Sequence, residues 1–206
     1  MMSAVTGRKP LDWLLYSVLT CVWASAYAFT RLAVNLPDPA RGLPPALVLS
    51  VRLTLGAVIL LTVVMLLRKR FPPLSDRRRW LTMLTMGVIG MTLPFFVITI
   101  GQQTVPSSLA ALYVAAAPLF VACLAHFAFK DERMTAMKAA GLLVGFSGLA
   151  LLFGPDAISA FGSASMTAQA LCLLGTMFYA CSSIIARGAP DMSPIVFAAG
   201  FVTMAA

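Results

Sequence analysis

The chain contains a series of long apolar runs separated by short polar breaks, and this pattern restricts what it can fold into. The hydrocarbon core of a bilayer is about 30 Å thick, so an α-helix needs about 20 apolar residues to cross it. Hydrophobic residues make up 60% of the sequence and charged residues 11%, and the mean hydropathy is +0.92. These values predict an all-α, polytopic transmembrane helical bundle. The predicted spans are Trp13–Val34, Ala46–Leu67, Trp80–Gly101, Leu109–Phe129, Ala136–Phe153 and Thr167–Ala186.

A seventh apolar run begins at Pro194 and reaches the last residue of the sequence, Ala206. This run has about half the length that a membrane crossing requires. We therefore expect the sequence to be a piece of a longer membrane protein, in which the seventh helix is completed and further helices follow.

The basic residues are confined to alternate breaks between the predicted spans. The net charge is +8, but Lys and Arg beside spans govern membrane orientation, so we expect no nucleic-acid partner. Because these residues accumulate in cytoplasmic loops, the pattern predicts a multi-pass membrane protein with a cytoplasmic N-terminus. We expect its location to be the inner (plasma) membrane. We expect the first span to be retained, since it is too long for a signal peptide. The basic breaks hold Arg8, Lys9, residues 68–70, residues 77–79, Lys130, Arg133, Lys138 and Arg187, and the breaks between them hold Arg41 alone or none.

The sequence lacks the motifs of familiar catalytic and ATP-driven proteins. HExxH, GxSxG, a P-loop and a GxGxxG before a helix are all missing from it. The four cysteines lie inside predicted spans without CxxC spacing, so we predict no metal site, no cofactor and no disulfide framework. Every Asp and Glu falls at a span edge or in a loop, which leaves no buried carboxylate for proton coupling. The protein is therefore not expected to be an enzyme, and transport becomes the leading class.

Glycines and prolines inside the spans predict how the helices pack and bend. Gly141, Gly145 and Gly148 share one face of the fifth helix, where we expect a close helix contact. Pro94 and Pro118 lie in mid-span, and each removes an amide donor, which predicts a kink. A carbonyl freed inside a membrane needs a protein neighbour or water. Two interpretations stay open: the third and fourth helices border a central cavity, or packing fills the bends.

Arg52 is the most costly residue of the predicted spans. It lies about 9 Å inside the second predicted helix. A guanidinium near the bilayer centre costs on the order of 3 kcal/mol on insertion scales. Three roles stay open for Arg52: its side chain extends to the outer surface, binds backbone carbonyls, or contacts an anionic group of a substrate.

Aromatic and hydroxyl side chains gather in the first and fourth predicted helices. Trp23 and Tyr27 are four residues apart and share a helix face, Ser25 is nearby, and Tyr113 comes from the fourth helix. Rings supply contact area and hydroxyls orient a ligand, so these residues suit a site for small organic molecules. Core packing explains them equally well.

Two segments of the chain resemble each other. Trp23-Ala24-Ser25 precedes Arg31 as Tyr179-Ala180-Cys181 precedes Arg187, with the same spacing from aromatic residue to arginine. The match relates the first helix to the sixth. Because a block of five helices is an odd number, the second copy enters the membrane from the opposite side, as in inverted-repeat carriers. Such carriers hold their substrate near the midplane between the repeats.

These residues resemble the EamA-type transporters of the drug/metabolite transporter superfamily. The resemblance rests on Trp23-Ala24-Ser25-Ala26-Tyr27, on Arg52 and on residues 107–154, which contain an alanine-rich start, Pro118, an Asp131-Glu132-Arg133 turn and spaced glycines. It implies ten helices in two inverted five-helix repeats with both termini in the cytoplasm. Residues 1–154 would form the first repeat and residues 155–206 the start of the second, about six and a half helices in all. It also implies carriage of amino acids, other metabolites or toxic compounds, often outward.

We therefore predict a carrier, acting as an exporter, that moves small organic solutes such as amino acids by alternating access. Its expected partners are a small-molecule substrate and the lipid bilayer, and its expected state is a monomer or homodimer. The alternatives are a non-transporting membrane scaffold subunit and an intramembrane enzyme with its catalytic groups outside this sequence. The predicted substrate-pathway residues are Trp23, Ser25, Tyr27, Arg52, Tyr113 and Tyr179, with Pro94 and Pro118 as helix kinks.

Overall fold

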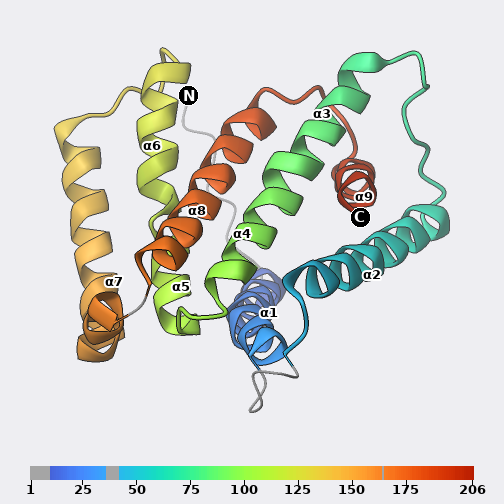
Figure 1. The fold of residues 1–206 in the computed structure, drawn as a ribbon. Coiled ribbons are helices and arrows are strands. Elements are labelled where there is room, and N and C mark those ends of the chain that lie inside the picture. Colours follow the sequence, from blue (N-terminus) through green and yellow to red (C-terminus); the bar gives the residue numbers. More distant parts are fainter. Residues whose placement is uncertain (1–9, 36–41, 164) are drawn as a thin grey trace.

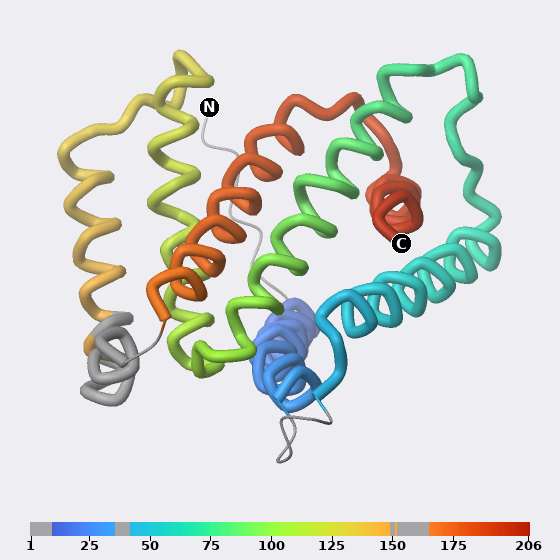
Figure 2. The backbone as a smooth tube through the Cα atoms, viewed as in Figure 1, coloured from blue at the N-terminus to red at the C-terminus, as the bar shows by residue number. Residues whose placement is uncertain are grey.

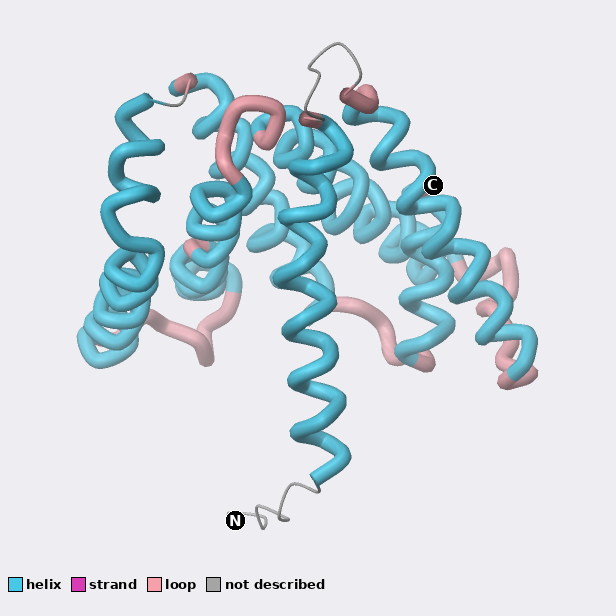
Figure 3. The backbone as a smooth tube through the Cα atoms, turned by 90° about the horizontal axis from the view of Figure 1, so that it is seen from below, coloured by secondary structure: helices cyan, strands magenta, loops and turns pink. Residues whose placement is uncertain are grey.

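The computed structural model describes the backbone of residues 10–35, 42–163 and 165–206, and the side chains of these residues except 149–150 and 152–163. The described residues form helices joined by loops, without strands (Figure 1, Figure 3). The helices are α1 (Pro10–Val34), α2 (Pro45–Leu66), α3 (Arg77–Gly87), the π-helical turn η2 (Val88–Thr92), α4 (Leu93–Gly101), α5 (Ser107–Ala115), α6 (Ala117–Ala128), α7 (Ala136–Ser163), α8 (Met166–Arg187) and α9 (Pro194–Ala205).

The helices have the lengths that a membrane-spanning bundle needs. Pro194–Ala205 and the part of α7 from Ala136 to Gly148 are apolar but shorter than a membrane crossing. The prediction of an all-α, polytopic helical bundle is confirmed, and each full span begins and ends within three residues of its predicted bounds. Among the described residues, the stretches long and apolar enough to cross a bilayer are Pro10–Val34, Pro45–Leu66, Arg77–Gly101, Ser107–Ala128 and Met166–Arg187.

Pro94 and Pro118 lie where the third and fourth spans are interrupted. The π-helical turn η2 comes just before Pro94, and Ala116 separates α5 from α6 just before Pro118. Since proline has no amide hydrogen, the regular hydrogen-bond ladder of the helix cannot continue through it. At the second interruption, the Thr176 hydroxyl of α8 donates to the carbonyl of Tyr113 at 3.1 Å. The Tyr113 carbonyl also accepts from the Ala116 amide at 3.0 Å, so a neighbouring helix adds a second donor beside the break.

The C-terminal part of α7 differs from the prediction. The sequence predicted a span that ends at Phe153 and a loop from Gly154, but the helix continues to Ser163. The predicted end followed the apolar run, whereas the helix continues past Gly154 and Pro155. A proline interrupts hydrogen bonding inside a helix without necessarily ending it.

Helices from both predicted repeats share one core. α8 packs between α4 and α6, and α9 packs against α2 and α3 (Figure 1, Figure 2). α1 contributes little to this core, since Thr30 and Val34 are its buried residues. A cluster of buried side chains lies between α8 and α5 with the loop before it, and consists of Val105, Leu109, Ala110, Tyr113, Ala168 and Cys172.

Two glycines allow helices to approach closely at different places in the bundle. A Cβ atom built on Gly101 of α4 would lie 2.7 Å from the Cys172 Sγ of α8. One built on Gly87 of α3 would lie 2.6 Å from the carbonyl oxygen of Phe201 in α9. Both distances are shorter than real contacts, so a residue without Cβ is required at each position.

The predicted glycine contact on α7 is wrong for the described part of the chain. A Cβ atom built on Gly141, Gly145 or Gly148 would have no heavy atom within 4 Å. α7 lies at the edge of the bundle and packs mainly against α5 (Figure 1). The spacing identified a small-residue face correctly, but spacing carries no information on whether another helix covers it.

Candidate functional site

Side chains from four helices meet around Arg52 of α2. The Arg52 Cζ lies 4.2 Å from the centroid of the Phe95 ring in α4, a cation–π contact. The Phe95 ring makes an edge-to-face contact with Tyr179 of α8, with centroids 6.0 Å apart and an interplanar angle of 84°. Tyr27 of α1 is close enough to interact electrostatically with both Arg52 and Tyr179. We call Tyr27, Arg52, Phe95 and Tyr179 the arginine–aromatic cluster.

The cluster combines one positive charge with three aromatic rings. A guanidinium that stacks on a ring keeps its N–H donors at its edge, where they remain available to an acceptor. The rings and phenol hydroxyls supply apolar contact area and directional hydrogen bonding. The arrangement therefore suits a small organic molecule with a polar acceptor group and an apolar body.

Three of the predicted pathway residues, Tyr27, Arg52 and Tyr179, belong to this cluster. Phe95 was not predicted, although it directly follows Pro94 at the interruption of the third span. An interrupted helix exposes backbone groups and frequently marks a functional position in membrane proteins. The position of Phe95 next to Pro94 could therefore have predicted a role for this residue.

Tyr113 belongs to a buried polar network between α5 and α8, beside the cluster. Its hydroxyl donates to the Gln169 Oε1 at 2.5 Å. The fully buried Thr176 hydroxyl shares its hydrogen between the carbonyls of Tyr113, at 3.1 Å, and Cys172, at 2.9 Å. Cys172 is close enough to interact electrostatically with both Tyr27 and Tyr113. Cys172 thus joins the polar network through its carbonyl and lies within electrostatic range of Tyr27 in the arginine–aromatic cluster.

Trp23 and Ser25 lie on α1 outside the contacts of the arginine–aromatic cluster. The Trp23 side chain is 72% exposed, and its ring contacts no other aromatic ring among the described residues. The Ser25 hydroxyl donates to the Val22 carbonyl of its own helix at 2.9 Å. Their assignment to the substrate pathway stays a prediction.

The buried polar network makes a measurable prediction for Thr176. Replacing Thr176 by valine removes the hydrogen bond between α5 and α8 while the shape of the side chain is kept. We expect the free energy of unfolding in detergent micelles to fall by about 1 kcal/mol. Thr62→Val is the matched control, because the exposed Thr62 hydroxyl bonds only the Val58 carbonyl of its own helix, at 2.7 Å. Equal losses in the two variants would contradict a role for the interhelical bond.

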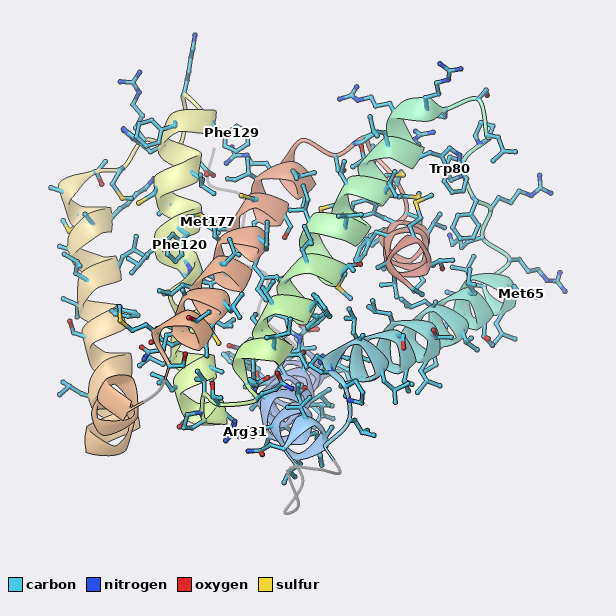
Figure 4. All side chains as sticks on the ribbon, in the orientation of Figure 1. Arg31, Met65, Trp80, Phe120, Phe129 and Met177 are labelled. Carbon is cyan, nitrogen blue, oxygen red and sulfur yellow. The ribbon has the colours of Figure 1, made fainter. Side chains whose placement is uncertain are left out.

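Arg31 ties the C-terminal end of α1 to the loop between α4 and α5. Its guanidinium donates to the carbonyls of Gln102 and Val105, the latter at 3.1 Å. In return, the buried Gln102 side chain donates from Nε2 to the Tyr27 carbonyl at 3.1 Å. Figure 4 shows Arg31 at this end of the bundle. Arg31 therefore holds the end of α1 through specific backbone partners.

Arg187 ties the end of α8 to the turn between α6 and α7. It forms ion pairs with Asp131, at 2.8 Å, and with Glu132. Its Cζ also lies 4.3 Å from the centroid of the Phe129 ring. Phe129 lies at the opposite end of the bundle from Arg31 (Figure 4). Arg187 therefore joins a helix of the second predicted repeat to a turn of the first.

A second contact at this end involves the arginine-rich start of α3. The Arg79 Nη2 donates to the carbonyl of Asp191 in the loop between α8 and α9, at 3.1 Å. The Asp76 carboxylate accepts a hydrogen bond from the Arg79 backbone amide at 3.2 Å and so caps α3. Three of the basic breaks thus lie at one end of the bundle, as the charge pattern predicted (Figure 1).

The described residues hold no group of three or more His, Cys, Asp or Glu side chains placed to bind a metal ion. All four cysteines are free thiols. The single histidine, His126, accepts a hydrogen bond at Nδ1 from the backbone amide of Met134 at 3.0 Å. Its visible role is to hold the turn that follows α6.

Comparisons with known proteins point to one family. A model of the EamA-like transporter family matches residues 11–154. The uncharacterized transporter YoaV of Bacillus subtilis is 30% identical over 142 residues, which cover 68% of this chain and 45% of that protein. The uncharacterized inner membrane transporter YedA of Escherichia coli is 27% identical over 199 residues, which cover 96% of this chain and 59% of that protein. No solved structure matches the chain.

The chain spans about half the length of the curated relatives it matches. The family model covers more than half of the chain and includes α1 to α6 and most of α7. The sequence motifs, the helical spans and the family match agree. The chain is a multi-pass membrane protein that belongs to the EamA-like transporter family.

Proposed function

We propose that this protein is a carrier that moves small organic solutes, such as amino acids or related metabolites, outward across the inner membrane. The observation that carries the proposal is the arginine–aromatic cluster. It draws Tyr27, Arg52 and Phe95 from the first predicted repeat and Tyr179 from the second. Inverted-repeat carriers bind their substrate where the two repeats meet. The family and the names of the relatives support transport as the activity.

Alternating access is proposed as the mechanism, with the N-terminus and the basic end of the bundle in the cytoplasm. At that end, Arg187 links the two predicted repeats through partly exposed ion pairs with Asp131 and Glu132. Exposed ion pairs contribute about 1 kcal/mol or less each. Contacts this weak can hold the end closed and still separate within a transport cycle.

Flux through proteoliposomes tests the proposal. The purified protein is reconstituted, and movement of radiolabelled phenylalanine and threonine is measured with the wild type and with Tyr179→Ala. We expect saturable flux in the wild type and about a tenfold loss in the variant, because removing a ring from a binding site weakens it by about 1.4 kcal/mol.

Tyr16→Ala is the control for this experiment. Tyr16 is a tyrosine of α1 whose side chain is 64% exposed and whose ring contacts Trp13 outside the cluster. We expect its flux to equal that of the wild type. Absence of flux for every solute in the wild type would favour the scaffold interpretation, and equal flux in both variants would remove the cluster from the pathway.

A further inference from the structure

Arg52 lies well inside a span, and no oxygen atom of the described residues forms a hydrogen bond or ion pair with its guanidinium. Its contact is the Phe95 ring, and the residue is exposed. Arg31 and Arg187, at span ends, bind carbonyl or carboxylate oxygens. The N–H donors of Arg52 are therefore available to a partner from outside the described residues.

The position of Arg52 argues against extension of its side chain to the membrane surface. Arg52 is seven residues from Pro45, the start of α2, which places it about 10 Å along the helix. Its guanidinium lies over Phe95, which is six residues from Gly101, the end of α4, or about 9 Å along that helix. The start of α2 and the end of α4 lie at the same end of the bundle (Figure 1). The guanidinium therefore lies beside Phe95, near the start of α4, and not beside Gly101 at its end.

The surroundings of the guanidinium define what it can bind. A planar guanidinium fits a carboxylate, which accepts two parallel hydrogen bonds from it. The arginine–aromatic cluster contributes one cation and three rings, so it matches one negative charge on an apolar or aromatic body. A phosphate group with two charges would need further cations, and the described residues place none in the cluster.

We propose that Arg52 binds the carboxylate of the transported solute and that the rings of Phe95 and Tyr179 hold its apolar body. The substrate class is thus organic carboxylates with one negative charge at the site. This inference rests on the proposed function and adds to it the chemical group that the carrier recognises.

A pair of ligands that differ only in charge tests the inference. N-acetyl-L-phenylalanine carries a carboxylate, and N-acetyl-L-phenylalaninamide carries a neutral amide on the same body. Binding of each to the detergent-purified protein is measured from the ligand-dependent rise of Tm. We expect the wild type to bind the acid at least about tenfold more tightly than the amide, as hydrogen bonds to charged groups imply.

Arg52→Gln is expected to abolish this preference, whereas Arg52→Lys should retain part of it because the charge remains. Arg78→Gln is the matched control, since it removes one positive charge from the exposed start of α3. We expect that variant to keep the wild-type preference for the acid. If Arg52→Gln does not fold, comparison of the wild type with Arg52→Lys still tests the preference for the acid.

Equal binding of acid and amide by the wild type would overturn the inference, as would failure of the acid to bind or an unchanged preference in Arg52→Gln. Any of these outcomes combined with wild-type flux of amino acids would remove the carboxylate role of Arg52 and leave the carrier function standing. Lack of flux for every solute would instead contradict the proposed function itself.

Discussion

Replacing Gly101 by leucine is expected to prevent α4 from packing against α8 and to lower the free energy of unfolding by about 3 kcal/mol or more. A Cβ atom at this position would lie 2.7 Å from the Cys172 Sγ and 2.8 Å from the Ala168 carbonyl oxygen. The thiol can rotate away, but the carbonyl belongs to the backbone of α8 and cannot. The two helices would have to separate, which breaks the contact between the predicted repeats. Thermal unfolding in detergent and the monodisperse fraction on size exclusion measure the effect.

Gly145→Leu is the control for this variant. Gly145 is also a glycine in an apolar helix, but a Cβ atom there would meet no heavy atom of the described residues within 4 Å. Leucine also has a higher helix propensity than glycine, by about 0.5–1 kcal/mol. We expect the unfolding temperature of Gly145→Leu to stay at or slightly above that of the wild type. A loss as large as that of Gly101→Leu would show that the space around α7 is occupied in the protein as it exists in solution.

Alanine alone is expected to be disruptive at Gly87. The added Cβ would lie 2.6 Å from the Phe201 carbonyl oxygen and 3.3 Å from the Ala205 amide nitrogen, both backbone atoms of α9. Since neither neighbour is the end of a flexible side chain, α9 would have to shift away from α3. We expect a loss of about 2–3 kcal/mol in the free energy of unfolding.

Gly56→Ala tests whether close packing, rather than the loss of any glycine near α9, is responsible. A Cβ atom at Gly56 of α2 would lie 3.5 Å from the Val202 Cγ1, an ordinary van der Waals contact. We expect this variant to unfold at or above the wild-type temperature, because the methyl group adds contact without strain. If both alanine variants were equally stable, the helix approach at Gly87 would not be as close as the structure describes.

The spans and their interruptions could be predicted because the bilayer imposes them. A helix that crosses hydrocarbon needs a minimum apolar length, so runs such as Ala46–Leu67 can be recognised from the sequence by their length and composition. Proline acts on its own backbone, so Pro94 and Pro118 indicate the interruptions without knowledge of any neighbour. The charge pattern likewise depends on single loops and correctly grouped three of the basic breaks at one end. The remaining break, with Arg8 and Lys9, lies outside the described residues.

Helix contacts were harder to predict because lipid is as apolar as the side chains that face protein. Apolar periodicity therefore does not separate a buried face from a lipid-exposed one in a membrane helix. The glycine face of α7 had the right spacing, but no described residue packs against it, whereas the isolated Gly87 and Gly101 make close contacts. For the site, the chemistry of Tyr27, Arg52 and Tyr179 was visible in the sequence. Phe95 was missed because its role depends on which helix lies beside Arg52.

The π-helical turn η2 determines which way the two halves of the third span face. A turn with one extra residue advances the following helix by about 100° around its axis relative to a regular helix. α3 accordingly presents Met83 and Gly87 to α9, while α4 presents Ile98 and Gly101 to α8. The two halves of one span thus pack against two different helices, α9 and α8, which lie on different sides of its axis. The alignment of Phe95 with the guanidinium of Arg52 depends on this change of helical phase several residues earlier.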